Sequence, residues 1–254
     1  KRRKWLKYFS RKDEYTEKSL ETLKLVNLEG YENRMPSELS GGQQQRVAVA
    51  RAIVLKPKVL LFDEPLSNLD AKLRRQVRED IREIQQKLGV TTIYVTHDQE
   101  EALAISDKVI VMNNAIIAQQ GSPKELYNSP KTEFVASFIG DANVVKAEVI
   151  NQNKNKYELK LAEMKIDIES TQKLENSVSI ALRPEKINIS KDREENSINA
   201  TINNASFVGN SYQYILNTAI GKIYVVSGDT KNVFKVGENV CLKFDEKELK
   251  LLED

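Results

Sequence analysis

Two short runs of β-branched and apolar residues, each ending in side chains that carry chemistry, constrain the fold of this chain most. Val59 to Phe62 leads into Asp63-Glu64, and Thr91 to Thr96 leads into His97. Segments with helical periodicity flank both runs, a pattern typical of buried parallel strands. The sequence therefore predicts an α/β portion in which these two runs are strands.

Helix signals surround the two predicted strands. A helix is expected from about Asp13 to Leu25, on apolar periodicity. Ser40 can cap the next helix, which Lys56-Pro57 ends. Asp70 can cap a third helix ending before Gly89. The apolar face of this third helix is formed by Leu73, Val77, Ile81, Ile84 and Leu88.

The segment before the first helix is basic and carries interleaved aromatic residues. Lys1 to Lys12 includes Trp5, Tyr8 and Phe9. One interpretation is an arm that binds nucleic acid or a membrane surface. The other, which we favour, is a solvated surface loop.

Composition limits the possible partners. A net charge of +2 gives no strong field for nucleic acid, so no nucleic-acid partner is expected. The single cysteine, Cys241, cannot form an internal disulfide and is expected in the core. No apolar run approaches the ~20 residues that span a bilayer. A role at a membrane would therefore require a separate membrane partner.

The pattern changes after Asp141. Before it, two strands are expected near Lys108 to Met112 and Ala115 to Gln119, followed by short helices up to about Ile139. After it, short β-type runs alternate with turn residues, which indicates a small barrel. These runs are Ser177 to Leu182, Ser197 to Asn203, Tyr212 to Leu216, Lys222 to Val226 and Asn239 to Phe244.

The acidic pair after the first strand suits phosphate chemistry. Asp63 can hold Mg²⁺, directly or through water, beside nucleotide phosphates. Glu64 can orient or deprotonate an attacking water. The alternative is two surface acids before Pro65, and the flanking apolar run and Ser67-Asn68-Leu69-Asp70 argue against it.

A second candidate site lies at the start of the helix that Ser40 caps. Ser40-Gly41-Gly42-Gln43 places small residues at a helix N-terminus, where backbone N–H groups bind anions. An ordinary glycine-rich helix start explains the serine and glycines but not the whole run from Leu39 to Gln45. His97 is the only histidine, so it cannot belong to a histidine-rich metal site.

In this order and spacing, the motifs resemble the C-terminal half of an ABC-transporter ATPase. The resemblance implies the C-terminal part of a P-loop ATPase domain over residues 1–140 and a small all-β, OB-like TOBE domain over residues 141–254. Ala181 to Glu185 and Val236 to Glu238 resemble that second domain.

The resemblance assigns a role to each candidate residue. Glu64 and His97 are implied as catalytic residues, and Asp63 as the Mg²⁺ ligand. ATP is implied as the second cofactor. Its contacts are assigned to Ser40, Gly41, Gly42, Gln43 and Asp70.

Partners and location also follow from the resemblance. It implies a head-to-tail homodimer, transmembrane permease subunits, indirect work with a solute-binding protein, and a place on the cytoplasmic face of the membrane. Val135 to Asn143 and Lys56 to Asp70 resemble ferric-iron importers most closely. Importers of polyamines, phosphonates or quaternary amines are similar. A soluble ATPase is disfavoured by the barrel, and a non-enzymatic regulatory fragment is the remaining alternative.

One motif of that family does not occur in these residues. No G-x-x-x-x-G-K-[ST] loop is found: the only Gly-Lys pair, Gly221-Lys222, has Leu216 in place of the first glycine and Ile223 in place of Ser/Thr. We therefore expect an N-terminally truncated ATPase that does not hydrolyse ATP as an isolated chain.

Overall fold

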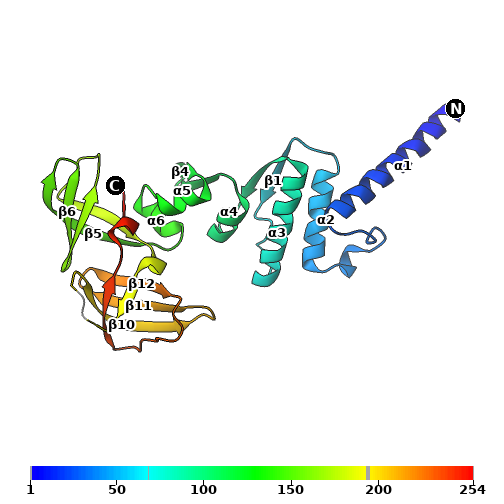
Figure 1. Cartoon of the computed structure of the whole chain (residues 1–254). Coiled ribbons are helices and arrows are strands. Elements are labelled where there is room, and N and C mark those ends of the chain that lie inside the picture. The colour runs from blue at the N-terminus through cyan, green and yellow to red at the C-terminus, as the bar shows by residue number, and fades with distance from the viewer. Residues whose placement is uncertain (1, 68, 193–194, 254) are drawn as a thin grey trace. The chain divides into compact units, whose positions relative to one another are not determined.

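The structure is a computed structural model that describes residues 2–67, 69–192 and 195–253, with side chains from residue 14 onward (Figure 1). It divides into two compact units, Lys1–Ser106 and Asp107–Asp254. Asn68 lies outside the described residues, and so do the side chains of the basic N-terminal segment. The interpretations of the Ser67–Asp70 motif and of a basic arm rest in part on them.

The first unit mixes helices and strands, as predicted. Its elements are α1 (Arg2–Leu25), the 3-10 turn η1 (Pro36–Glu38), α2 (Gly41–Ile53), β1 (Val59–Asp63), α3 (Ala71–Leu88), β2 (Thr91–Val95) and α4 (Gln99–Ile105). The prediction of a surface loop before Asp13 is wrong, because α1 begins at Arg2. No proline or glycine interrupts this stretch, so the helix extends back beyond the apolar pattern that revealed it.

The predicted caps are confirmed. The Ser40 hydroxyl accepts the Gln43 N–H at 3.4 Å, and the Asp70 carboxylate accepts the Leu73 N–H at 3.0 Å. Gly89 ends α3 in the left-handed region at φ 59°, where a residue with a β-carbon is disfavoured. Local capping chemistry thus fixes where α2 and α3 begin, and where α3 ends.

Helices α2 and α3 pack closely within the first unit, and Figure 1 shows them side by side. A β-carbon on Gly42 would lie 2.8 Å from Leu73 Cδ1, so Gly42 allows the two helices to approach. The buried face of α3 carries Val77, Ile81 and Ile84, as the periodicity predicted. Leu88, at the end of that predicted face, is 38% exposed.

Strands β1 and β2 pair in parallel, in the register Leu61↔Ile93 and Asp63↔Val95. Leu60 is buried and Phe62 packs against the same core. The opposite face is exposed and apolar, so the expectation of strands buried on both sides holds for one face only. That exposed face is formed by Val59, Leu61, Ile93 and Val95.

The second unit is mainly β. It begins with the antiparallel pair β3 (Val109–Asn113) and β4 (Ile116–Gly121), then α5 (Pro123–Asn128) and α6 (Glu133–Phe138). The remaining elements are β5 (Asn143–Asn153), β6 (Lys156–Leu161), β7 (Met164–Glu169), β8 (Ser177–Leu182), η2 (Pro184–Lys186), β9 (Asn188–Ser190), β10 (Ile198–Phe207), β11 (Tyr212–Thr218), β12 (Gly221–Ser227), β13 (Asn239–Lys243), η3 (Glu246–Glu248) and β14 (Lys250–Leu251).

Two five-stranded antiparallel sheets share one hydrophobic core in this unit. Their strand orders are β12-β11-β10-β13-β9 and β14-β8-β5-β6-β7. Both sheets contribute to the same buried cluster, for example through Leu159 and Tyr214. The predicted all-β, barrel-like domain is confirmed, and Cys241 is buried as expected. No helix among the described residues is long and apolar enough to cross a membrane.

The segment before the sheets belongs to the compact β-rich unit. Residues 107–140, which the sequence analysis placed with the ATPase portion, fall in the second unit. Arg183 holds them there: its guanidinium donates to backbone carbonyls of Tyr127, Ala136 and Ile139. It also lies 3.9 Å from the centre of the Tyr127 ring. A buried cation thus binds the C-terminal ends of α5 and α6, where the helix dipole favours positive charge.

Burial changes the ionisation of this cluster. Arg183 is 7% exposed, and burial lowers the pKa of its guanidinium. Burial, with a further contribution from the 2.6 Å hydrogen bond to Glu185, raises the pKa of the Tyr127 hydroxyl to about 12. At neutral pH the tyrosine therefore remains a donor to the carboxylate, and the cluster keeps its hydrogen bonds.

Gly140 provides a test of this packing. Both Gly140 and Gly237 have positive φ, at 82° and 88°, but a β-carbon on Gly140 would lie 2.3 Å from the Tyr127 ring, whereas nothing lies within 4 Å at Gly237. We expect Gly140→Ala to lower the free energy of unfolding by about 1–3 kcal/mol more than Gly237→Ala, because overpacking adds to backbone strain. Urea unfolding of both variants measures the difference, and equal losses would show that the clash relaxes without cost.

Candidate functional site

The parallel pairing of β1 and β2 brings Glu64 and His97 together. Because Asp63 pairs with Val95, the residues that follow both strands lie at one edge of the sheet. The Glu64 N–H donates to the Val95 carbonyl at 2.9 Å and extends the pairing by one residue. Glu64 Oε1 then lies 3.2 Å from His97 Nδ1. The side chains are 49% and 75% exposed, so this pair is accessible to a ligand.

Glu64 has an unusual backbone conformation. Its φ is 44°, a left-handed value that is rare for residues other than glycine and asparagine. Ser67 stabilises the turn by donating to the Glu64 carbonyl from its hydroxyl at 3.1 Å. Strain at a residue with a candidate chemical role is typical of functional sites.

Asp63, the last residue of β1, is exposed at the same edge. Among the described residues, no group of three or more His, Cys, Asp or Glu side chains could hold a metal. Mg²⁺ beside phosphates needs only one or two carboxylates, since phosphate oxygens and water complete its octahedron. The exposed carboxylate of Asp63 is therefore a suitable ligand for Mg²⁺ bound beside phosphates.

The second candidate cluster lies at the N-terminus of α2. Ser40 and Gln43 form a reciprocal capping box, in which the Gln43 side chain accepts the Ser40 N–H at 2.9 Å. The N–H groups of Gly41 and Gly42 precede the first intrahelical bond, from Gln44 N–H to the Ser40 carbonyl. Such groups have no intrahelical acceptor and are suited to an anion. Among the described residues, no hydrogen bond joins this cluster to Glu64 or His97.

Asp70 lies between Glu64 and His97 in the sequence and is occupied as a helix cap. Its carboxylate accepts the Leu73 N–H, and its carbonyl accepts the Arg74 N–H at 2.8 Å. A β-carbon on Gly41 would lie 3.5 Å from Leu69 Cδ2, so the start of α2 packs beside the residue before Asp70. The structure thus places Leu69, the residue before Asp70, beside the N-terminal turn of α2.

A network of hydrogen bonds around a buried glutamate lies beneath His97 and was not predicted from the sequence. Glu101 on α4 is 3% exposed and accepts hydrogen bonds from the hydroxyls of Tyr94 and Thr96, at 3.1 and 2.8 Å. Arg74 on α3 reaches the same carboxylate at 3.8 Å. An acid in the first turn of a helix is ordinary in sequence, and only tertiary packing reveals that this one is buried.

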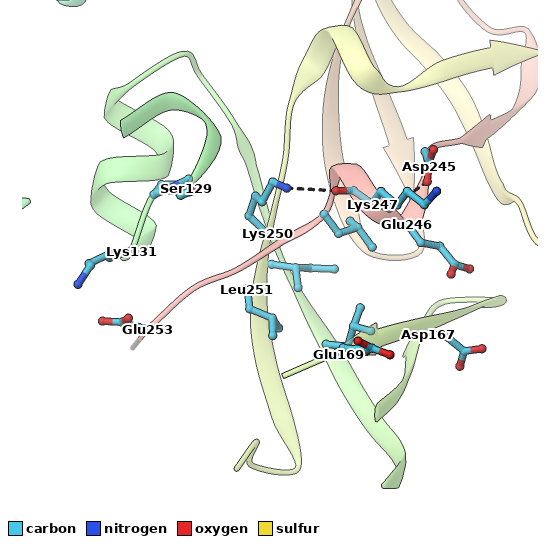
Figure 2. A pocket seen from close by; sticks show the side chains of 14 residues that line it. Ser129, Lys131, Asp167, Glu169, Asp245, Glu246, Lys247, Lys250, Leu251 and Glu253 are labelled. Atoms are coloured by element: carbon cyan, nitrogen blue, oxygen red, sulfur yellow. Dashed lines mark hydrogen bonds between the residues drawn. The ribbon is translucent and has the colours of Figure 1, made fainter. Parts of the chain in front are cut away.

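The second unit contains a cleft of about 750 Å³, which Figure 2 shows from close by. It lies along the edge strands β7 and β14, with an apolar floor that includes Ile168 and Leu251. Its rim mixes acids with lysines, for example Asp167 and Glu169 with Lys250. Charged side chains and a two-residue strand are how proteins protect sheet edges from pairing. We therefore assign no ligand to this cleft.

Comparison with known proteins defines the class. Residues 3–67 match the ABC transporter family, and residues 180–252 match the TOBE domain. The Fe(3+) ions import ATP-binding protein FbpC of Agrobacterium fabrum is 44% identical over 96% of this chain and 69% of its own length. Its counterpart in Brucella melitensis is 43% identical over 95% and 68%. The chain therefore belongs to the family of ABC-transporter ATP-binding proteins with a TOBE domain.

Two further proteins resemble this chain over a smaller part of its length. FbpC of Photorhabdus laumondii is 44% identical over 91% of this chain and 65% of its own length. The solved structure of cbiO1 from Clostridium perfringens, described as part of the ABC transporter complex cbiONQ, is 36% identical, with a TM-score of 0.43, over 45% of this chain and 46% of that one. The family assignment rests on the full-length sequence relatives.

The strained backbone of Glu64 makes a testable prediction. Glycine adopts φ 44° without strain, so Glu64→Gly should be more stable than Glu64→Ala by about 1 kcal/mol. This reverses the usual order, in which alanine is the more stable residue. Denaturant unfolding of the two variants gives the comparison. If Glu64→Ala were the more stable, the left-handed backbone at this position would be wrong.

Proposed function

We propose that this chain carries two parts of an ATPase that powers a ferric-iron importer. One part activates water, and the other is the segment Ser40–Gln43, which we call the signature. The observation that carries the ATPase function is the 3.2 Å contact between Glu64 and His97 at the ends of two neighbouring parallel strands. Ferric iron is the cargo of the relatives by their names, and we extend it to this transporter.

Glu64 serves as the general base in this proposal. An ionised carboxylate accepts hydrogen bonds only, so its contact with His97 requires a proton on Nδ1. The imidazole would contact Glu64 through Nδ1 and a phosphate oxygen through Nε2. Glu64 then takes the proton of a water positioned between carboxylate and phosphate, which is general-base catalysis. His97 orients the base and stabilises phosphate charge.

Asp63 supports the same chemistry as a ligand of Mg²⁺. The ion neutralises charge on the β- and γ-phosphates when it is bound with ATP. The location of Asp63, one residue before the base, keeps the metal ligand and the base on one strand end.

Ser40, Gly41, Gly42 and Gln43 form the second half of a composite site. We propose that the N–H groups at the start of α2 contact the nucleotide held by a second copy in a head-to-tail homodimer, since a helix N-terminus attracts phosphate. Asp70 caps α3 beside this turn and connects the two halves through the Ser67–Asp70 segment.

The remaining assignments concern assembly. We propose that residues 1–140 belong functionally to the motor and that residues 141–254 regulate it or strengthen its dimer. Permease subunits carry the solute across the membrane, with the ATPase bound at their cytoplasmic face and a separate protein delivering the solute. None of the candidate site residues contacts the cargo in this arrangement.

The base assignment predicts the effect of Glu64→Gln in the complete transporter. Turnover should fall by about 10² or more while Mg-ATP binding persists, because the amide keeps the shape but takes no proton. Glu79→Gln, on the exposed face of α3, is the matched control. Steady-state hydrolysis and nucleotide binding measure the two effects, and turnover within twofold of wild type would reject Glu64 as the base. Radiolabelled ferric-iron uptake by the wild type tests the cargo separately.

If the signature acts on the nucleotide of the partner subunit, ATPase activity should differ between two mixed dimers. One has its two substitutions on opposite subunits, and the other has both on one subunit. Ser40→Asp keeps a capping oxygen and adds negative charge that opposes phosphate, whereas Ser40→Asn caps without charge. Combined with Glu64→Gln on the opposite subunit, Ser40→Asp puts both lesions in one composite site and leaves the other intact. When both substitutions are on one subunit, each composite site carries one of them. Activity should then be lower than in the dimer with the substitutions on opposite subunits. Equal activities, or the reverse order, would contradict action in trans; Ser40→Asn should show no such difference.

A further inference from the structure

A buried carboxylate lies directly beneath the segment that carries His97. Glu101 is 3% exposed, and its Oε2 accepts both the Tyr94 and Thr96 hydroxyls. Burial of a charge is costly unless it is paired and hydrogen-bonded. Burial, followed by the charge of Glu101, raises the pKa of the Tyr94 hydroxyl well above its ordinary value, so Tyr94 stays a donor. The remaining oxygen faces Arg74 at 3.8 Å.

Arg74 reaches three separate parts of the site. Its NH1 lies 3.2 Å from Asp98 Oδ2, and its NH2 donates to the Leu69 carbonyl at 3.2 Å. With the contact to Glu101, one guanidinium spans the turn after β1, the start of α4 and the body of α4. The planar, rigid fork of arginine allows such contacts at once, which a lysine ammonium cannot reproduce.

The residues on both sides of His97 are held by this network. Thr96 donates to Glu101 and accepts the Asp98 N–H at 3.0 Å. Asp98 binds Arg74 and also caps α4 by accepting the Glu101 N–H at 3.1 Å. The imidazole between them is 75% exposed and touches Glu64. The backbone of His97 is thus fixed from below while its ring faces solvent.

We infer that Arg74 is a positioning residue that holds the His97 segment and the turn at Leu69–Asp70 in fixed positions relative to each other. The catalytic consequence rests on the function proposed above, since it requires His97 to act on phosphate. Arg74 itself touches neither Glu64 nor His97. Its effect passes through Asp98 and Glu101 on one side and through the Leu69 carbonyl on the other.

A simple stabilising ion pair between α3 and α4 would predict something different. It would lower global stability without loosening one segment more than another. Hydrogen exchange separates the two cases, because local opening and global unfolding give different patterns along the chain.

The first experiment uses the chain itself and needs no ATP. In Arg74→Met, amide exchange over residues 66–70 and 96–101 should quicken by about tenfold relative to the rest of the first unit. Arg75→Met is the matched control, since Arg75 is 76% exposed and pairs only along α3 with Glu79 at 3.5 Å. His97 is the only histidine in the sequence, so the two carbon–proton NMR signals of a histidine ring, from Cε1 and Cδ2, both belong to it, and they should shift in Arg74→Met but not in Arg75→Met.

Two further variants keep the test decisive. Arg74→Lys retains charge but loses the fork, so it should show the same local loosening if Arg74→Met fails to fold. Glu101→Gln can still accept from Tyr94 and Thr96 while it removes the charge facing Arg74. Uniform acceleration throughout the first unit, or no change in the histidine signal, would overturn the positioning role.

A kinetic measurement in the complete transporter tests the consequence. In Arg74→Met, kcat should fall about tenfold with KM for ATP within about twofold, because displaced catalytic groups lower turnover rather than binding. Arg75→Met should leave both values unchanged. If exchange loosens as expected but Glu64→Gln leaves turnover intact, the proposed function fails while the coupling of the two segments stands. If exchange is unaffected, the inference about Arg74 fails by itself.

Discussion

The parallel register of β1 and β2 is the constraint on which the site depends. Asp63 opposite Val95 places the chain after each strand at the same edge, and the Glu64 N–H to Val95 bond carries the pairing one residue further. A shift of one residue would invert the faces of a strand and separate Glu64 from His97. The packing of Leu60 and Phe62 into the core therefore has a chemical consequence beyond stability, because it selects the register.

The left-handed backbone of Glu64 follows from this arrangement. The residue must finish the pairing with Val95 and at once begin the turn that Ser67 closes. Those two demands bend the chain sharply at one position, and glycine would meet them at lower cost. A carboxylate at this position therefore comes with local strain, and it is the group that we propose as the general base. Stability and chemistry thus make opposite demands on position 64.

Local signals in the sequence predicted much of the first unit. Ser40, Asp70 and Gly89 determine helix ends through contacts within four residues, so their roles can be read from sequence alone. The two strands and the order of their terminal residues were also predicted. The N-terminal helix was underestimated because its basic residues favoured a solvated loop, although Trp5, Tyr8 and Phe9 have the i, i+3, i+4 spacing of a helix. Strands β6 and β7 were not among the runs identified from the sequence, although charged residues alternate with apolar ones along both.

Tertiary features were beyond such reasoning for a physical reason. The sequence suggests that Gly42 belongs to an anion site. The structure adds a second reason for a glycine there, because Leu73 of another helix leaves no room for a β-carbon. Glu101 and Arg74 read as surface charges, and only the packing of α4 on α3 buries one against the other. In the second unit, Arg183 likewise gains its role from carbonyls more than forty residues away in sequence.

Both units use an arginine to fix the ends of helices, buried in the second unit and half-buried in the first. In the second, the Arg183 guanidinium satisfies carbonyls at the ends of α5 and α6, which binds residues 107–140 to the β-rich core. In the first, Arg74 binds the turn before α3 to the start of α4. Arginine suits both places, because one planar group reaches several acceptors that do not share a helix. Directional contacts to one cation restrict the segments that bear them. Such restriction suits the chemistry proposed for Glu64 and His97, which requires precise placement of the reacting groups.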